Sequence, residues 1–459
     1  MALGTILTAQ LMLQMDLLIV IVALPQIQTE LGFTPAGLTW VLNAFALAFG
    51  GLLLLGGRLG DIYGQVRVFR IGIAIFVAAS LVGGLAGSAS VLIAARVLQG
   101  VGAALAGPSV LALITTMARD EAERNRGLSL FIAVSSVGAS AGLILGGALT
   151  DLASWRWSLL INVPVGLIVL LLIGSLVEET RRKPARLDVS GAVTATFGSV
   201  ALVYGFLGAA DHGWFAGNTL ASFGAAVVLL AAFLYTEKRI REPLLDLSLL
   251  RNRRRAGGLV VMAMIVGMNF SMLFLIVQYL QQVLGFGSLV TGLAFLPLTA
   301  TVFVATHFIP RLIARFGPRP LMTGGTVLVA ASMLGFAALD DGGVYVPFVI
   351  VPMIVHAIGI ALVFVPGTVA IMDGVPDEHS GAASGLLQMD QQIGGALGIA
   401  IIAAVYAGEA VPDDFSAGLG AAFVVGAVIA LLATLVTLVT NGAKSRRGKD
   451  NLRQPVVHL

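Results

Sequence analysis

The chain has 459 residues, of which 58% are hydrophobic and only 11% are charged, whereas a soluble domain has roughly 25% charged residues. This much apolar surface excludes a water-soluble fold and indicates a chain embedded in lipid. The net charge of +3 is small, and the lack of cysteine excludes disulfides, thiolate metal ligands and cysteine nucleophiles.

Apolar stretches of about 20 residues recur along the chain, each long enough to cross a hydrocarbon core of about 30 Å as a helix. The first starts almost at Met1 without a basic segment before it, so we expect a span there and no cleavable signal peptide. Some stretches are separated only by short polar segments, which leaves twelve or thirteen spans as alternatives to fourteen. The fourteen predicted spans are residues 5–24, 37–57, 69–88, 91–117, 127–150, 156–177, 189–210, 217–236, 257–280, 289–310, 320–338, 346–372, 381–408 and 417–440.

Basic residues fall on one side of this predicted topology. With the N-terminus in the cytoplasm, 25 of the 27 Lys and Arg residues lie in cytoplasmic segments, and the other two are Arg96 and Arg156. The positive-inside rule therefore predicts that both termini are cytoplasmic. Because Arg greatly outnumbers Lys and Ala and Gly are abundant, we expect a GC-rich bacterial genome and a multi-pass protein of the bacterial plasma (inner) membrane.

The two most basic loops, residues 178–188 and 237–255, bracket one pair of spans. They are expected to set the topology, with binding of anionic lipid headgroups as the alternative. We predict an all-α polytopic membrane protein in which two six-helix bundles are joined by two additional inserted helices. The predicted parts are an N-terminal bundle at 1–187, two inserted helices with a basic cytoplasmic loop at 188–256, a C-terminal bundle at 257–440 and a basic cytoplasmic tail at 441–459.

The turn between the second and third predicted spans carries glycine, aspartate and arginine at a fixed spacing, as Gly57, Asp61, Gly64 and Arg67. Glycine permits a tight turn, and Asp61 can face the N-terminus of a neighbouring helix. The run resembles the loop motif of the major facilitator superfamily, whose fold we therefore expect. The resemblance implies that Asp61 and Arg67 form a conformational latch at the cytoplasmic face; an ordinary turn between helices is the alternative.

Arg96 lies inside the fourth predicted span, where an arginine costs about 3 kcal/mol unless it faces water or a partner. Gln99, Gly100 and Gly102 follow it. The run resembles the fourth-helix motif of the same superfamily, and this resemblance implies a part in proton coupling. An arginine that only bonds backbone carbonyls is the alternative.

The fifth predicted span contains Gly138, Gly142, Gly146 and Gly147, whose spacing lets another helix approach closely. The run resembles the superfamily's antiporter motif, which implies export by antiport and a glycine-rich hinge. Leu143 stands where that motif usually has proline. This difference keeps a proton-coupled importer open as an alternative.

Two carboxylates, Asp16 and Asp390, are embedded in predicted spans. Asp16 lies about eleven residues into the first span, close to the bilayer midplane. An embedded carboxylate can bind either a proton or a substrate cation, so we predict that Asp16, Arg96 and Asp390 serve proton or substrate coupling. For Asp16, the alternative is a structural partner for Arg96.

The first span, around Met15 and Asp16, and the start of the sixth span, with Asn162, resemble the fourteen-span drug:proton antiporter family of multidrug and antibiotic efflux proteins. A possible pocket contains side chains of the ninth and twelfth spans, with simple packing or lipid contact as the alternative. These pocket residues are Met268, Asn269, Phe270, Gln278 and His356.

These resemblances imply a monomeric, proton-coupled transporter that exports lipophilic, cationic drugs or antibiotics by alternating access. The expected partners are a small lipophilic molecule, protons and the lipid bilayer; nucleic acid, metal and organic cofactor are not expected. The alternatives are a proton-coupled importer and a nontransporting sensor or scaffold. The sequence contains neither HExxH nor GxxxxGK[ST], so zinc hydrolysis and ATP-driven transport are disfavoured and an enzyme is not expected.

Overall fold

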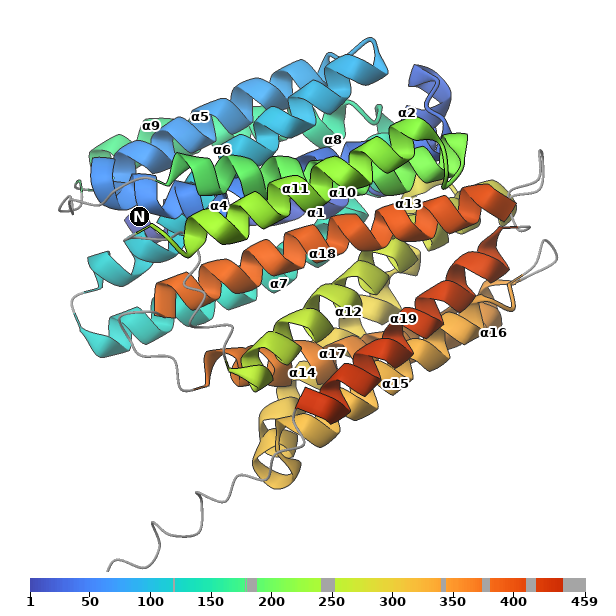
Figure 1. The fold of residues 1–459 in the computed structure, drawn as a ribbon. Coiled ribbons are helices and arrows are strands. Elements are labelled where there is room, and N and C mark those ends of the chain that lie inside the picture. The colour runs from blue at the N-terminus through green and yellow to red at the C-terminus, as the bar shows by residue number, and fades with distance from the viewer. Residues whose placement is uncertain are drawn as a thin grey trace, which may run out of the picture.

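The computed structural model describes residues 1–118, 120–177, 179, 188–240, 252–339, 344–373, 380–409 and 418–440. The elements in these ranges are helices, and no strand occurs among them (Figure 1). The predicted basic tail, residues 441–459, lies outside the described residues, as does most of each of the two basic loops.

Twelve helical segments of the described chain are long and apolar enough to cross a membrane. Four of them comprise two labelled elements each, three because of a short break and one because the α-helix continues as a π-helix. They are α1 (Ala2–Ile19), α4 (Trp40–Tyr63), α5 (Gln65–Gly84), α6 (Ala89–Met117), α8 with α9 (Trp157–Leu160, Asn162–Leu176), α10 (Val189–His212), α11 (Gly217–Glu237), α12 with the π-helix η2 (Arg253–Gln278, Tyr279–Val283), α13 with α14 (Ser288–Ala294, Leu296–Phe316), α16 with α17 (Tyr345–Phe348, Ile350–Met372), α18 (Ser380–Glu409) and α19 (Leu419–Thr440).

The predicted number of fourteen spans is not supported, because only these twelve segments meet the requirements of length and hydropathy. The two other predicted spans are helices. In α7 (Glu121–Leu152) the described apolar stretch is only Ala141–Leu152. α15 (Pro318–Phe336) begins with Pro-Arg-Pro, which lowers its hydropathy, although the helix packs against α17 and α19.

The helices pack in two groups that are held together by a smaller set of contacts. In the N-terminal group α6 packs against α4 and α5, and α1 packs against α7 and α9. In the C-terminal group α12 packs against α18 and α19, and α17 against α14 and α15. The pairs α4 with α18 and α7 with α13 join the groups, and α10 lies against both α4 and α18 while α11 packs on α10 (Figure 1).

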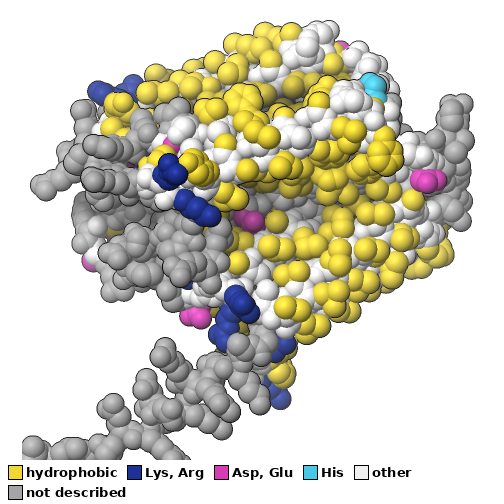
Figure 2. Space-filling view, viewed as in Figure 1, with side chains coloured by type: hydrophobic (Ala, Val, Ile, Leu, Met, Phe, Trp, Pro, Cys, Tyr) yellow, Lys and Arg dark blue, Asp and Glu magenta, His cyan; other side chains and the backbone are white. Residues whose placement is uncertain are grey.

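One face of the bundle is largely apolar. Figure 2 shows hydrophobic side chains over a broad area of one face, with the Lys and Arg side chains toward one end. Phe197, Val227 and Leu171 are among the large hydrophobic residues that are more than half exposed. An exposed apolar belt of this kind suits a lipid environment and not water.

The bundle has a motif end and a distal end. The motif end contains the turn between α4 and α5, where Gly64 has a φ of 101°, a conformation that favours glycine. The distal end contains the short helices α2 (Leu24–Leu31) and α3 (Pro35–Leu38), together with α13.

Candidate functional site

Asp16 of α1 is fully buried, and three side chains donate hydrogen bonds to its carboxylate. Arg96 Nη1 lies 2.6 Å from Oδ2, which makes a buried ion pair. Gln99 Nε2 and Asn162 Nδ2 lie 3.1 and 2.7 Å from Oδ1. All four residues are at most 3% exposed. The pairing of Asp16 with Arg96, which the sequence offered as the alternative to a coupling role, is therefore present in the structure.

Arg96 and Gln99 extend this network to neighbouring helices. Arg96 Nε donates to the Val41 carbonyl at 2.9 Å, and its guanidinium lies 4.5 Å from the ring centroid of Phe45. Gln99 accepts from Arg96 at 2.9 Å and donates to Ser80 Oγ at 2.8 Å. The network thus ties α1, α4, α5, α6 and α9 together. Because the ion pair is net neutral and further hydrogen bonds satisfy it, its burial is tolerated in an apolar interior.

Two glycines of the fourth-span motif place Arg96 among its partners. A Cβ at Gly100 would lie 2.6 Å from the Phe45 carbonyl of α4, and one at Gly102 would lie 2.7 Å from the Gly72 carbonyl of α5. A side chain at either position would force the helices apart. The motif therefore combines one charged residue with the small residues that let α6 approach both neighbours.

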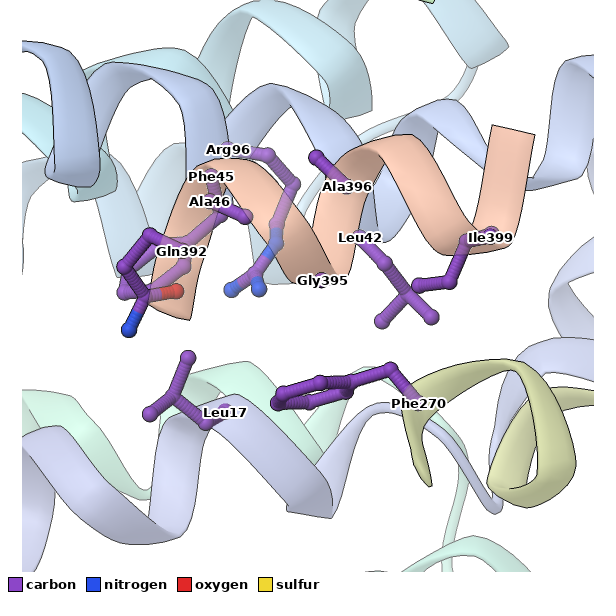
Figure 3. Close-up of a pocket in the computed structure, with 10 residues that line it drawn as sticks. All are labelled: Leu17, Leu42, Phe45, Ala46, Arg96, Phe270, Gln392, Gly395, Ala396 and Ile399. Carbon is purple, nitrogen blue, oxygen red and sulfur yellow. The ribbon is translucent and has the colours of Figure 1, made fainter. Parts of the chain in front are cut away.

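A small, open cavity lies between the two helix groups. In Figure 3 Arg96 and Gln392 extend into the same space, with Leu17 and Phe270 across from them. Arg96 is the one charged side chain among the described lining residues, and Asp16 is not among them. The lining residues are Leu17, Leu42, Phe45, Ala46, Arg96, Phe270, Gln392, Gly395, Ala396 and Ile399.

Of the five residues predicted for a pocket, Phe270 lines this cavity and the others lie elsewhere or outside its described lining. Met268 is packed in the core with its sulfur toward Gly426 of α19. Gln278 is buried and accepts a hydrogen bond from Gln282 at 2.7 Å. His356 is buried on α17 and bonds Ser332 of α15 at 3.0 Å.

The predicted pocket assumed that consecutive residues of one helix face the same cavity. Met268, Asn269 and Phe270 are consecutive residues of a helix and point about 100° apart, so they cannot all face the same cavity. Asn269 is not among the described lining residues.

Asp390, the third predicted coupling residue, is not part of the Asp16 network. It lies on α18, two residues before Gln392, so the two side chains point to nearly opposite sides of the helix. Its Oδ2 is buried and has no hydrogen-bond partner among the described residues. The structure therefore brings Asp16 and Arg96 together and places Asp390 apart from them.

At the motif end, the α4–α5 turn is held by a residue that the sequence analysis did not identify. The Glu179 carboxylate accepts from the backbone N–H groups of Val66 and Arg67 at 2.9 and 3.0 Å, at the N-terminus of α5. Asp61 accepts from Gln65 Nε2 at 3.2 Å. No ion pair joins Asp61 to Arg67 in the described part of the chain. The latch remains a prediction for another conformation.

The glycines of α7 lie against two different helices. Gly138 and Gly142 face α1, where a Cβ on Gly142 would lie 2.8 Å from the Met15 carbonyl. Gly146 also faces α1, at Ile19, whereas Gly147 faces Ser288 and Leu289 of α13. The glycine-rich face therefore brings α7 close to α1 and, at the distal end, to the C-terminal group.

The distal end also has polar contacts between the two groups. Asp151 of α7 accepts from the backbone N–H groups of Ser288 and Leu289 at 2.9 and 2.7 Å. Gln281 Nε2 donates to the Val22 carbonyl at 2.9 Å. These bonds join the two groups at the distal end, and any separation of the groups there must break them.

Sequence reasoning missed Asn162 as a partner of Asp16, and also Glu179, Asp151 and Gln392. An embedded amide such as Asn162 was a usable signal, because a buried polar side chain needs a partner. Nothing in the sequence alone pointed to the other three. Among the described residues, no group of three His, Asp or Glu side chains could hold a metal ion.

Comparisons with known proteins agree with this architecture. The family described as Major Facilitator Superfamily matches residues 6–399. The chain is similar to a puromycin resistance protein of Streptomyces alboniger, with 38% identity over 88% of this chain and 81% of that protein. It is also similar to a cephamycin export protein of Amycolatopsis lactamdurans, with 35% identity over 94% and 90% of the two chains.

Solved structures resemble the fold at low sequence identity. A crystal structure of the peptide transporter POT in complex with sulfate superposes with a TM-score of 0.71 at 15% identity, covering 96% of this chain and 94% of that one. This likeness concerns the arrangement of the helices alone.

Proposed function

Because the chain belongs to the major facilitator superfamily, we propose that it exports lipophilic drugs or antibiotics by proton-coupled alternating access. The chain is a membrane transporter of this superfamily and not an enzyme. Relatives named for puromycin resistance and for cephamycin export support the class of substrate. The observation that carries proton coupling is the buried Asp16 carboxylate with its three donors.

In this proposal the binding of a proton to Asp16 changes how the helices are held together. Protonation of Asp16 removes the negative charge that holds Arg96, Gln99 and Asn162 around it. The network that ties five helices is then weakened, and the equilibrium between access states shifts. A proton can drive such a shift only by binding the two states with different affinity.

The contacts at the distal end support alternating access. The bonds from Asp151 to α13 and from Gln281 to Val22 close the gap between the two groups at this end. Opening of the distal end requires that they break. We assign the Asp61 latch to the opposite state, in which the motif end is closed.

The finer assignments are part of the same proposal. We propose the fourteen-span drug:proton antiporter family, in which α7 and α15 also cross the membrane and α10 and α11 are the two inserted helices, and a monomer in the bacterial inner membrane with both termini cytoplasmic. The close packing of α15 on α17 and of α7 on α1 supports α7 and α15 as spans. The preference for cations expected from the sequence is not retained, because Arg96 and not Asp16 lines the cavity.

An accumulation assay in an efflux-deficient bacterial host tests this function. Expression should lower the accumulation of puromycin, for which one relative is named, and a protonophore should restore it. The matched control is Asp16→Asn, which should give no reduction. Raised accumulation would indicate an importer, and unchanged accumulation would indicate a sensor or scaffold; either result refutes the proposal.

A further inference from the structure

The cavity between the helix groups presents hydrogen-bond donors on an otherwise apolar surface. Its described lining contains two polar side chains, Arg96 of α6 and Gln392 of α18. The remaining eight residues are apolar side chains and one glycine. Such a site selects ligands by their apolar shape and by a few directed polar contacts.

Arg96 has a donor group that the buried network does not use. Its hydrogen bonds to Val41, Asp16 and Gln99 employ Nε and Nη1. Nη2 forms no hydrogen bond with the described residues, although the side chain is 99% buried and lines the cavity. The guanidinium nitrogen that is left over is therefore available to a ligand.

Gln392 offers a second donor beside it. The close approach of α4 and α18 places this residue, since a Cβ at Gly50 would lie 2.7 Å from the Gln392 Cβ. No hydrogen bond joins its amide to the described residues, and Figure 3 shows its amide and the Arg96 guanidinium extending toward the same space above Leu17 and Phe270. One ligand oxygen can thus be approached from two helices that belong to different groups.

The charge around the cavity argues against an ionic ligand. A cation would meet the Arg96 guanidinium first, because Asp16 is fully buried behind it and does not line the cavity. An anion would lose its hydration in an apolar site, while the charge of Arg96 is already balanced by Asp16 at 2.6 Å. A neutral acceptor avoids both penalties and still satisfies the free donors.

We propose that this cavity binds uncharged lipophilic compounds through a carbonyl oxygen that accepts hydrogen bonds from Arg96 Nη2 and the Gln392 amide. The apolar body of the ligand packs against Leu17, Phe45 and Phe270. This inference rests on the proposed transport function and names its substrate class. The ligand does not compete with a proton for Asp16. Ligand binding and protonation of Asp16 therefore affect each other only through the hydrogen-bond network that joins the helices.

Three fluorescent probes with the same pyrene body test the proposal by equilibrium binding. They are 1-pyrenebutyric acid methyl ester, which is uncharged and carries a carbonyl, 1-butylpyrene, which has no acceptor, and 1-pyrenebutylammonium. Binding is measured on the full chain in nanodiscs of zwitterionic lipid, with empty nanodiscs subtracted. The ester should bind at least fivefold more tightly than either of the other probes, as expected for about 1 kcal/mol from a buried hydrogen bond.

A matched pair of variants on α18 assigns the effect to the cavity. Gln392→Leu should weaken ester binding about fivefold and leave butylpyrene binding unchanged. Gln391→Leu makes the same chemical change at the next residue, which is not among the described lining residues, and should leave all three affinities unchanged. Arg96→Lys should also weaken ester binding, but since it disturbs the ion pair with Asp16, the Gln392 and Gln391 variants decide the result.

Three outcomes would each overturn the proposal. They are tighter binding of the ammonium probe than of the ester, equal effects of the two α18 variants, and no specific binding of any probe. These failures differ from failure of the transport function. Proton-coupled export of a drug together with preferred ammonium binding refutes only the cavity assignment. The expected ester preference without any proton-coupled transport refutes only the function.

Discussion

The two embedded carboxylates of this chain have opposite surroundings. Asp16, in the N-terminal group, has an ion pair and two amide donors, all buried. Asp390, in the C-terminal group, has an Oδ2 atom that is buried without a partner in the described chain. Position within a span made the two residues look alike, but their partners differ. The role of an acidic residue in a membrane helix therefore depends on the groups that surround it.

The largest effect is expected for Asp16→Asn, which leaves Arg96 buried without a counter-charge. Breaking a buried ion pair from one side destabilises by about 3 kcal/mol or more. The variant should still insert into the membrane, but its melting temperature should fall clearly below that of the wild-type protein. The double variant Asp16→Asn with Arg96→Gln should regain part of the loss, because it removes both charges. If Asp16→Asn alone is as stable as the wild type, the ion pair between Asp16 and Arg96 does not stabilise the fold.

A smaller loss is expected for Asn162→Ala, which removes one of the three donors to Asp16 while the ion pair remains. Hydrogen bonds to a charged group contribute about 1.5–3 kcal/mol. The melting temperature should fall, but less than for Asp16→Asn. The matched control is Asn218→Ala in the exposed start of α11, which should have little effect. If Asn162→Ala has the same melting temperature as this control, the 2.7 Å hydrogen bond from Asn162 to Asp16 contributes nothing to stability.

The sequence predicted the Asp16–Arg96 site because charged residues inside apolar spans are conspicuous and need partners. It also predicted the helical fold and the close approach of helices at Gly142. It did not predict Gln392, because one sequence does not fix the rotation of a helix, and a glutamine among apolar residues has no preferred direction. Glu179 was missed for another reason: it contacts the α5 N-terminus from more than 110 residues away in sequence.

The span number shows a different limit. The sequence predicted fourteen spans, whereas twelve segments of the described chain meet the requirements of length and hydropathy, because α15 begins with Pro-Arg-Pro and the described apolar stretch of α7 is only Ala141–Leu152. The grouping of Met268, Asn269 and Phe270 into one pocket failed because neighbours in sequence diverge around a helix.

Asp390→Asn should change stability by less than about 0.5 kcal/mol or increase it, because no described partner is lost and a buried carboxylate without one is unfavourable. The melting temperature is again the measurement. A decrease as large as that for Asp16→Asn would show that Asp390 has a strong partner of its own, and the contrast between the two carboxylates would disappear.

A similarly small effect concerns Glu30, an exposed carboxylate at the distal end that serves as a reference for the buried pair. Hydrogen bonds from Trp155 and Arg156 hold the pKa of Glu30 below its usual value of 4.5. A lowered pKa in the folded state means that this stabilisation is present above about pH 4.5 and is lost as the pH falls through the folded pKa. Glu30→Gln should lower stability at pH 6 by less than about 1 kcal/mol, as is usual for exposed pairs.

The difference in stability between the wild type and Glu30→Gln should become smaller in acid, because the wild-type side chain then becomes neutral too. Thermal unfolding of both proteins between pH 6 and pH 3 gives the comparison. A difference that stays constant over this range would mean that the charge of Glu30 does not contribute to stability.

The most direct test of Asp16 as the coupling site is proton flux in proteoliposomes with an imposed pH gradient, a pH-sensitive dye inside and puromycin as substrate. Wild-type protein and Asp390→Asn should both couple proton movement to puromycin accumulation, with Asp390→Asn at most mildly slower. Asp16→Asn should show neither proton flux nor uphill accumulation, although it can still exchange labelled for unlabelled puromycin, and Asp16→Glu should keep part of the coupled activity. Wild-type rates of proton flux and accumulation by Asp16→Asn would contradict the assignment and make Asp390 the residue to test next.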